Sequence, residues 1–271
     1  MSTFCGVTMV KDEADTIFGV LCHMASEGAD PLLVLDNGST DGTRALIDKA
    51  AAEVSATCEV RVFDDDEVGY YQSRKITAAL TRAARDDQLG WVVPFDADEL
   101  WHAGDVPLSV LFDHADERGV NLLTAKLLSH FVTGVDDDAV ADPFQRLVWR
   151  ERPVAPLPKI AFRWEHGAVV RQGNHAVQLA TPVVDSDTSI AVRHFPYRSA
   201  EQFVQKARNG ARAYAATRGL PRGMGDHWRS YGEILNRLGA QGLHDVWREH
   251  FYFLSPVDSK MVFDPAPYRR W

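Results

Sequence analysis

Short apolar runs alternate with amphipathic helical patterns through the first hundred residues, and this alternation limits the fold more than any other feature. FCGVTMV (4–10), PLLVLD (31–36), CEVRVF (58–63) and WVVPF (91–95) have the near-continuous hydrophobicity of buried strands. Helical patterns follow the first three runs, over residues 17–27, around residues 46–50 and over residues 70–85. This order predicts an α/β fold with a mostly parallel central sheet flanked by helices, in which ligands bind beyond the carboxyl ends of the strands.

After Trp101 the pattern becomes less regular. Residues 107–119 read as a helix, 120–132 as a long strand, and TGVDDDAVADP (133–143) as a mobile acidic loop. We expect a small antiparallel extension of the sheet and a helical tail. Ser199 and Gln202 form a capping box that opens this tail. The expected antiparallel strands are FQRLVWR (144–150), KIAFRW (159–164), HAVQL (175–179) and SIAVRHF (189–195).

Charge and cysteine content exclude several classes of protein. The 271 residues carry a formal net charge of −9, which argues against a nucleic-acid partner. The three cysteines include no CxxC pair, so neither a disulfide framework nor a thiolate zinc site is expected. The N-terminus lacks the basic and apolar regions of a signal peptide, and no apolar run approaches roughly 18 residues. We therefore expect a cytoplasmic protein without a transmembrane segment.

Polar side chains follow three of the predicted strands. Lys11 and Glu13 come after the first, Asp36 after the second, and Asp96 and Asp98 after the fourth. Two aspartates two positions apart lie on one face of an extended chain, which predicts a site for Mg²⁺ or Mn²⁺. Asp36 could accept hydrogen bonds from a base or a ribose. The alternative is that these residues only solvate strand ends and shape turns.

MVKDEADTI, VLDNGSTDGT and PFDADELW, in this order and spacing, resemble family 2 glycosyltransferases of the GT-A fold over roughly residues 5–102. RHFPYRSAEQFVQKARNG resembles a segment of a bacterial branch of that group. The resemblance implies a sugar transferase whose donor is a nucleoside-diphosphate sugar and whose acceptor is a sugar, a lipid or a small metabolite. Residues 1–131 would bind the donor, 132–198 would form an acceptor-side loop and mixed-sheet extension, and 199–271 a helical tail packed on the domain.

The resemblance also implies roles for individual residues. Asp98 and Asp96 would bind the divalent metal, with Asp96 also near the ribose, and the metal would stabilise the diphosphate leaving group. His175 is the expected third metal ligand, although a structural role is the common one for a single histidine. Nucleotide-sugar contacts are expected from Val10, Lys11, Glu13, Asp36, Asn37, Arg74, Asp96 and His194.

The catalytic base is the least defined part of the predicted site. Inverting members of the group carry an acidic residue downstream of the DxD, often in a doublet that begins a helix, and this chain has no clean counterpart. Asp142 and Glu165 are the candidates for general-base work, with solvated loop acids as the alternative. Inversion is expected and retention stays open.

Two other functions are alternatives to sugar transfer. One is a GT-A-like protein that binds a nucleotide or sugar without catalysis. The other is a nucleotidyltransferase, which would favour a glycine-rich basic loop where this chain has KDEAD. Residues 132–143 could act as a lid, and Trp149, Trp164 and Trp228 could offer rings for sugar stacking.

Overall fold

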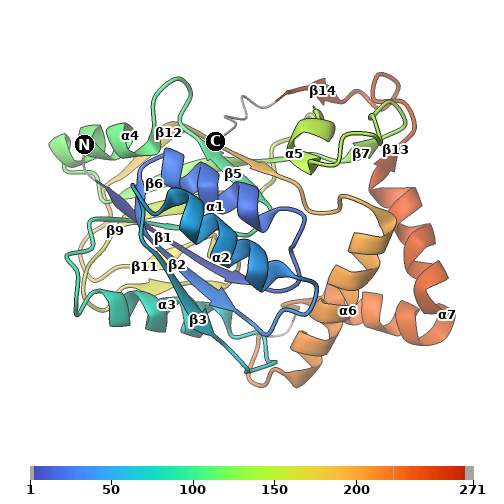
Figure 1. Cartoon of the computed structure of the whole chain (residues 1–271), viewed down its shortest axis with the longest axis horizontal. Helices are drawn as coiled ribbons and strands as arrows, with labels where there is room; N and C mark the ends of the chain where they lie inside the picture. The colour runs from blue at the N-terminus through green and yellow to red at the C-terminus, as the bar shows by residue number, and fades with distance from the viewer. Residues whose placement is uncertain (1–2, 222, 266–271) are drawn as a thin grey trace.

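The structure is a computed structural model that describes residues 3–221 and 223–265 (Figure 1). A large sheet, seven helices and several short strand pairs make up this part of the chain. The sheet strands are β1 (Phe4–Val10), β2 (Ala29–Asp36), β3 (Val60–Asp64), β4 (Trp91–Pro94), β5 (Glu99–His102), β6 (Leu122–Ser129), β9 (Lys159–Arg163) and β12 (Asp185–His194). The helices are α1 (Ile17–Ser26), α2 (Thr43–Val54), α3 (Gln72–Ala83), α4 (Leu108–Glu117), α5 (Pro143–Arg146), α6 (Ala200–Ala216) and α7 (Asp226–His250), with a 3₁₀ turn η1 (Gln172–Asn174).

The sheet has eight strands in the order β3-β2-β1-β4-β9-β6-β12-β5. The first four pair in parallel, as the strand–helix alternation predicts. Strand β9 then lies antiparallel to both β4 and β6, β12 is parallel to β6, and β5 closes the edge antiparallel to β12. The predicted α/β fold class is confirmed, with its antiparallel extension built into the same sheet.

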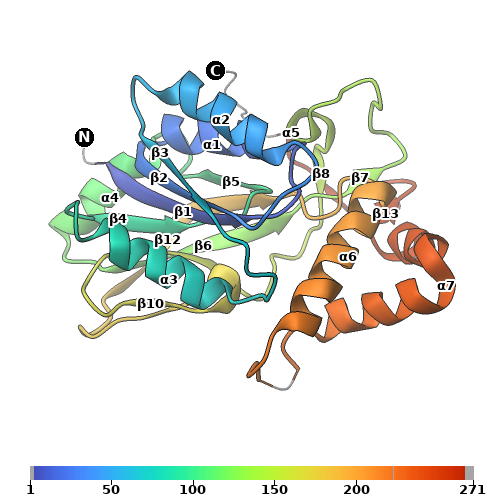
Figure 2. The ribbon, with the colours of Figure 1, turned by 60° about the horizontal axis from the view of Figure 1, so that its bottom comes forward.

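Helices cover both faces of the sheet (Figure 2). Helices α1, α2 and α4 pack on one face, and α3 packs on the other together with β10 (Val169–Val170) and β11 (Val177–Gln178). Alternate residues of β1 enter opposite cores: Phe4 and Val10 pack with the first group, Cys5 and Val7 with the second. This two-sided burial explains why the strand sequences are apolar without alternation.

A helical hairpin of α6 and α7 lies beyond the carboxyl ends of the parallel strands (Figure 2). The Ser199 hydroxyl accepts a hydrogen bond from the Gln202 backbone N–H, which confirms the predicted helix start. The hairpin has its own apolar cluster around Phe203, Ala207 and Leu243. Helix α7 is interrupted at Gly239, which has a φ of 66°.

Two local predictions were wrong. FQRLVWR is not one strand, because Asp142 and Pro143 start the short helix α5, and only β8 (Trp149–Arg150) is extended. The edge strand β5 was not predicted, because its residues directly follow an acidic run. Further two-stranded pairs join β7 (Val132–Thr133) with β13 (Tyr252–Phe253) and β8 with β14 (Val262–Phe263). The domain boundaries stay a prediction.

No helix within the described ranges combines the length and the apolar character needed to cross a bilayer.

Candidate active site

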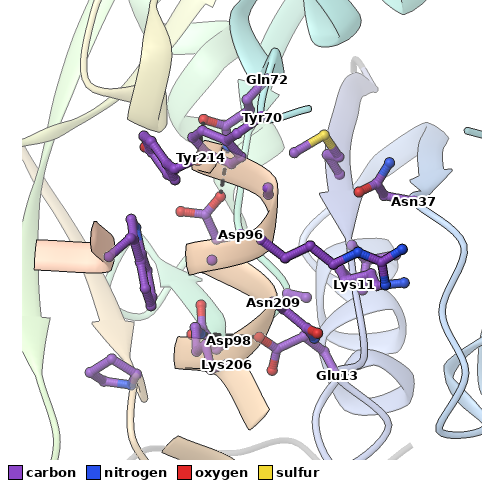
Figure 3. Close-up of a pocket in the computed structure, with 18 of the residues that line it drawn as sticks. Lys11, Glu13, Asn37, Tyr70, Gln72, Asp96, Asp98, Lys206, Asn209 and Tyr214 are labelled. Carbon is purple, nitrogen blue, oxygen red and sulfur yellow. Dashed lines mark hydrogen bonds and ion pairs between the residues drawn. The ribbon is translucent and has the colours of Figure 1, made fainter. Parts of the chain in front are cut away.

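A cavity of about 670 Å³ lies between the carboxyl ends of the parallel strands and the α6–α7 hairpin (Figure 3). This is the position at which open α/β sheets bind ligands. From the strand side it is lined by Val10, Lys11, Glu13, Asn37, Asp96 and Asp98. From the hairpin it is lined by Lys206, Asn209, Arg212, Tyr214, His227 and Trp228. Residues as far apart in the chain as Val10 and Trp228 therefore form one chamber.

The two aspartates reach the cavity by a turn. The expectation of an extended chain with both carboxylates on one face was wrong, because residues 97–98 turn between β4 and β5. The Glu99 N–H donates to the Asp96 carbonyl at 3.2 Å, and the Asp96 N–H donates to Glu99 Oε2 at 3.1 Å. As a result, the carboxylates of Asp96 and Asp98 lie at separate points of the wall (Figure 3).

Asp96 is held by three side chains. Its Oδ2 lies 2.6 Å from Nζ of Lys159, and its Oδ1 accepts from Gln72 Nε2 at 3.2 Å and from Asn174 Nδ2 at 3.1 Å. Lys159 is buried and also lies 2.7 Å from Glu99 Oε1. Burial alone would lower the pKa of Lys159, but Asp96 and Glu99 outweigh it and raise that pKa above its ordinary value. The lysine is therefore charged and neutralises Asp96.

Asp98 is compensated in the same way from α6. Its Oδ2 accepts a hydrogen bond from Nζ of Lys206, and Nη1 of Arg198 lies 3.7 Å away. Lys206 also lies 3.0 Å from Glu13 Oε1. Burial would raise the pKa of Asp98, but Lys206, His194 and Arg198 together hold it below its ordinary value. Asp98 is thus an anion surrounded by cations of the chain itself.

The loops after β1 and β2 form the end of the cavity where the nucleobase is predicted to bind. The buried Asp36 accepts from the Ser39 N–H at 2.9 Å and supports the turn from behind the cavity wall. The Asn37 side chain donates to Asp65 Oδ2 and to the Glu67 carbonyl, both at 2.8 Å. Lys11 donates to the Gly38 carbonyl. Lys11 and Asn37 remain part of the cavity wall (Figure 3).

Arg74 is not brought to the cavity. Its exposed guanidinium pairs with Glu67 and lies over the Tyr71 ring, 4.5 Å from the centroid. Arg74 is therefore not among the residues that line the chamber.

Both predicted histidines line the cavity. His175 Nδ1 lies 2.9 Å from the Pro158 carbonyl, which favours the tautomer with the proton on Nδ1 and the lone pair on Nε2. Its pKa is lowered by burial and by Lys159. His194 Nε2 lies 3.7 Å from Asp98 Oδ1, and burial lowers the His194 pKa to about 4. Both rings are neutral at pH 7.

Residues 11–176 match the family model described as Glycosyl transferase family 2. The chain belongs to this family. Glycosyltransferase AglJ of Haloferax volcanii is 32% identical over 117 residues, which are 41% of this chain and 34% of that protein. The chain thus spans about a third of the length of that curated relative. Family 2 membership agrees with the predicted GT-A fold class.

Solved structures give weaker likenesses. S. aureus TarS 1-349 is 13% identical with a TM-score of 0.44, covering 89% of this chain and 74% of that one. A mycobacterial protein is 24% identical with a TM-score of 0.31, covering 47% and 41%. Neither likeness is close enough to carry an argument about the site of this family 2 member.

Neither candidate for the base of a family 2 enzyme lines the cavity. Asp142 caps α5, where its Oδ1 accepts from the Phe144 N–H at 2.9 Å. Glu165 accepts from the Thr181 hydroxyl at 2.5 Å and from its N–H at 3.1 Å. These positions indicate structural roles for both carboxylates. Of the three tryptophans, Trp228 lines the cavity.

The predicted divalent ion does not fit between Asp96 and Asp98 as the structure places them. An ion between Asp96 and Asp98 would have to displace Lys159 and Lys206 from them. Within residues 3–221 and 223–265, the group whose potential ligand atoms all lie within 4.8 Å of one another is His23, Glu27 and His102. That group lies outside the cavity, and Glu27 accepts from the N–H of Leu108 at the start of α4.

The residues that hold the carboxylates of this family 2 site are not evident from the sequence. Lys206 stands in the QKARNG segment, whose resemblance marked it without giving a partner. Lys159 opens an ordinary strand sequence, and nothing in KIAFRW distinguishes a buried lysine. Gln72 and Asn174 likewise gain their roles from the fold.

Proposed function

We propose that this protein transfers a glycosyl group from a nucleoside-diphosphate sugar to a hydroxyl acceptor. The proposal is carried by one observation: Asp96 and Asp98 share a cavity with Lys11 and Asn37, so the ends of three parallel strands converge on one site. Membership of glycosyl transferase family 2 supports this reading.

The donor lies along the strand side of the cavity in this proposal. The base and ribose occupy the end bounded by Lys11 and Asn37, where polar backbone and side-chain groups are exposed to the cavity. The sugar and the diphosphate lie toward Asp96 and Asp98. A carboxylate beside a sugar accepts hydrogen bonds from its hydroxyls, and Lys159 holds the Asp96 carboxylate in place at 2.6 Å.

The acceptor enters from the hairpin side. Tyr214, His227 and Trp228 line that wall, and aromatic rings offer flat apolar faces to sugar rings. The acceptor class, the inverting outcome and a cytoplasmic location remain predictions. The proposal assigns no carboxylate as the catalytic base.

A transfer assay tests the proposal. The protein is incubated with a panel of nucleoside-diphosphate sugars and mixed hydroxyl acceptors, and mass spectrometry detects glycosylated product and free nucleoside diphosphate. Asp96→Asn removes the charge that faces the cavity, and we expect the rate to fall by about 100-fold or more. Asp105→Asn, at an exposed position outside the cavity, is the control and should transfer like the wild type.

Two outcomes would favour the other functions. Nucleotide binding without any transferred sugar would favour a non-catalytic binding protein. Release of pyrophosphate from nucleoside triphosphates would favour a nucleotidyltransferase.

A further inference from the structure

Lys206 spans the cavity from the α6–α7 hairpin to the strand ends. Its Nζ contacts Asp98 Oδ2 and lies 3.0 Å from Glu13 Oε1 (Figure 3). Residue 206 lies outside the part of the chain that matches the family model, which ends at residue 176. The hairpin therefore adds a positive charge to a site whose carboxylates come from the family core.

We propose that Lys206 takes the place of a divalent cation at Asp98 and binds the diphosphate of the donor, so that donor binding needs no metal ion. This inference rests on the proposed glycosyl transfer. It follows from the poor fit of an ion between carboxylates that the protein's own lysines already neutralise.

The hydrogen-bonding capacity of the ammonium group supports this role. A lysine ammonium has three N–H donors; that of Lys206 donates to Asp98 and lies 3.0 Å from Glu13 Oε1. The side chain of Lys206 is 23% exposed and lines the cavity, so the third donor is available to a phosphate oxygen. Asp98 itself is only 3% exposed and is covered by Lys206.

Displacing Lys206 from Asp98 would be costly. A metal ion at Asp98 would push the ammonium away from two carboxylates, while Arg198, 3.7 Å from the same Oδ2, would still repel the ion. At Asp96 the competing cation is Lys159, whose side chain is 3% exposed and fixed between Asp96 and Glu99. A divalent ion could therefore bind to neither carboxylate without a large cost in free energy.

The other cavity charges fit an anionic ligand placed beside α6. Arg212, six residues after Lys206 on the same helix, also lines the cavity, and Lys11 faces it from the strand side. The opposing carboxylates of Glu13 and Asp98 are paired with Lys206 and Arg198. A diphosphate beside α6 would therefore meet Lys206, Arg212 and Lys11, while Glu13 and Asp98 share the positive charges of Lys206 and Arg198.

Calorimetric titration of UDP, GDP, ADP and CDP tests the inference, with each titration run once in EDTA and once with Mn²⁺. We expect the wild type to bind one of them with dissociation constants that agree within about twofold in the two buffers. Lys206→Met should weaken this binding in EDTA by about tenfold or more, since a charged hydrogen bond is lost. Lys206→Arg keeps the charge and should retain most of the affinity.

The matched control is Arg208→Met, which removes an exposed cation from the same helix and should leave binding unchanged. Thermal unfolding of each variant separates lost binding from lost folding. Wild-type binding that requires Mn²⁺ and is unaffected by Lys206→Met would overturn the inference and leave the proposed function standing. Binding of no nucleotide in either buffer would overturn both.

Discussion

Arg198 and Asp15 are joined by an ion pair in which Nε of the guanidinium lies 2.7 Å from Oδ2 of the carboxylate. The same guanidinium pairs with Glu13 and donates from Nη1 to the Phe195 carbonyl at 2.8 Å. Its side chain is 1% exposed. The segment that leads into α6 is thus fixed to the loop after β1.

Arg198→Met should destabilise the protein strongly. The substitution leaves buried carboxylates without one of their cations, which costs about 3–5 kcal/mol in the free energy of unfolding. Urea unfolding at pH 7 measures it. Arg229→Met, which breaks an exposed pair with Asp226, should cost less than about 1 kcal/mol. Equal losses in the two variants would show that the Arg198 cluster does not stabilise the fold.

Gly210→Ala should weaken the packing of α6 against α7 and lower the free energy of unfolding. A Cβ at residue 210 would lie 2.4 Å from the Trp228 ring, and overpacking of this kind costs about 1–3 kcal/mol. The control is Gly232→Ala, whose Cβ would lie 3.0 Å from that of Ala211. The better helix propensity of alanine, about 1 kcal/mol, applies at both positions, so the closer contact should leave Gly210→Ala as the less stable variant. Unfolding free energies that rank the two variants in reverse would contradict this packing.

Much of the first half of the fold could be predicted from the sequence. Strands such as β1 and β2 are buried on both faces, and this leaves continuous apolar runs that only a covered sheet explains. Because parallel strands end at one edge, the convergence of Lys11, Asn37 and Asp96 on one cavity followed from the order of the elements.

The second half of the site could not be predicted in the same way. The partners of Asp96 and Asp98 are Lys159 and Lys206, which lie 63 and 108 residues away in the chain. Pairings at such separation depend on how β9 and α6 are placed in space, and neither local propensity nor charge pattern fixes that placement. The edge strand β5 is also hard to predict, because its few apolar residues directly follow the acidic turn.

Asp142→Ala and Glu165→Ala test whether either acid is the base. Both carboxylates are engaged in local hydrogen bonds outside the cavity, so we expect transfer rates within about threefold of the wild type, against the 100-fold or greater loss typical of a missing general base. Asp142→Ala should cost about 1 kcal/mol of stability as a lost helix cap. A large fall in kcat with unchanged donor affinity would instead identify the substituted residue as the base.

The buried His130 should make the protein less stable in mild acid. Its ring stacks on Phe195, Nδ1 lies 2.9 Å from the Leu147 carbonyl, and Nε2 lies 3.6 Å from Asp264. Burial lowers the pKa of His130 despite the nearby carboxylate. In the unfolded chain the pKa of His130 is about 6.5. Between that pH and the lower pKa of the folded state, the unfolded chain therefore binds more protons than the folded protein. The contribution of His130 to the free energy of unfolding should fall as the pH drops below about 6.5 and stop changing below the folded pKa of His130.

His130→Gln isolates this contribution. His175, His194 and His227 also have lowered pKa values, chiefly from burial, and act in the same direction, so the variant should keep part of the slope. Each such group contributes at most about 1.4 kcal/mol per pH unit, and urea unfolding between pH 7 and pH 5 would show the wild-type slope reduced by up to that amount. If the variant and the wild type lose stability in parallel over this range, His130 is protonated equally in both states and its burial does not disfavour the imidazolium.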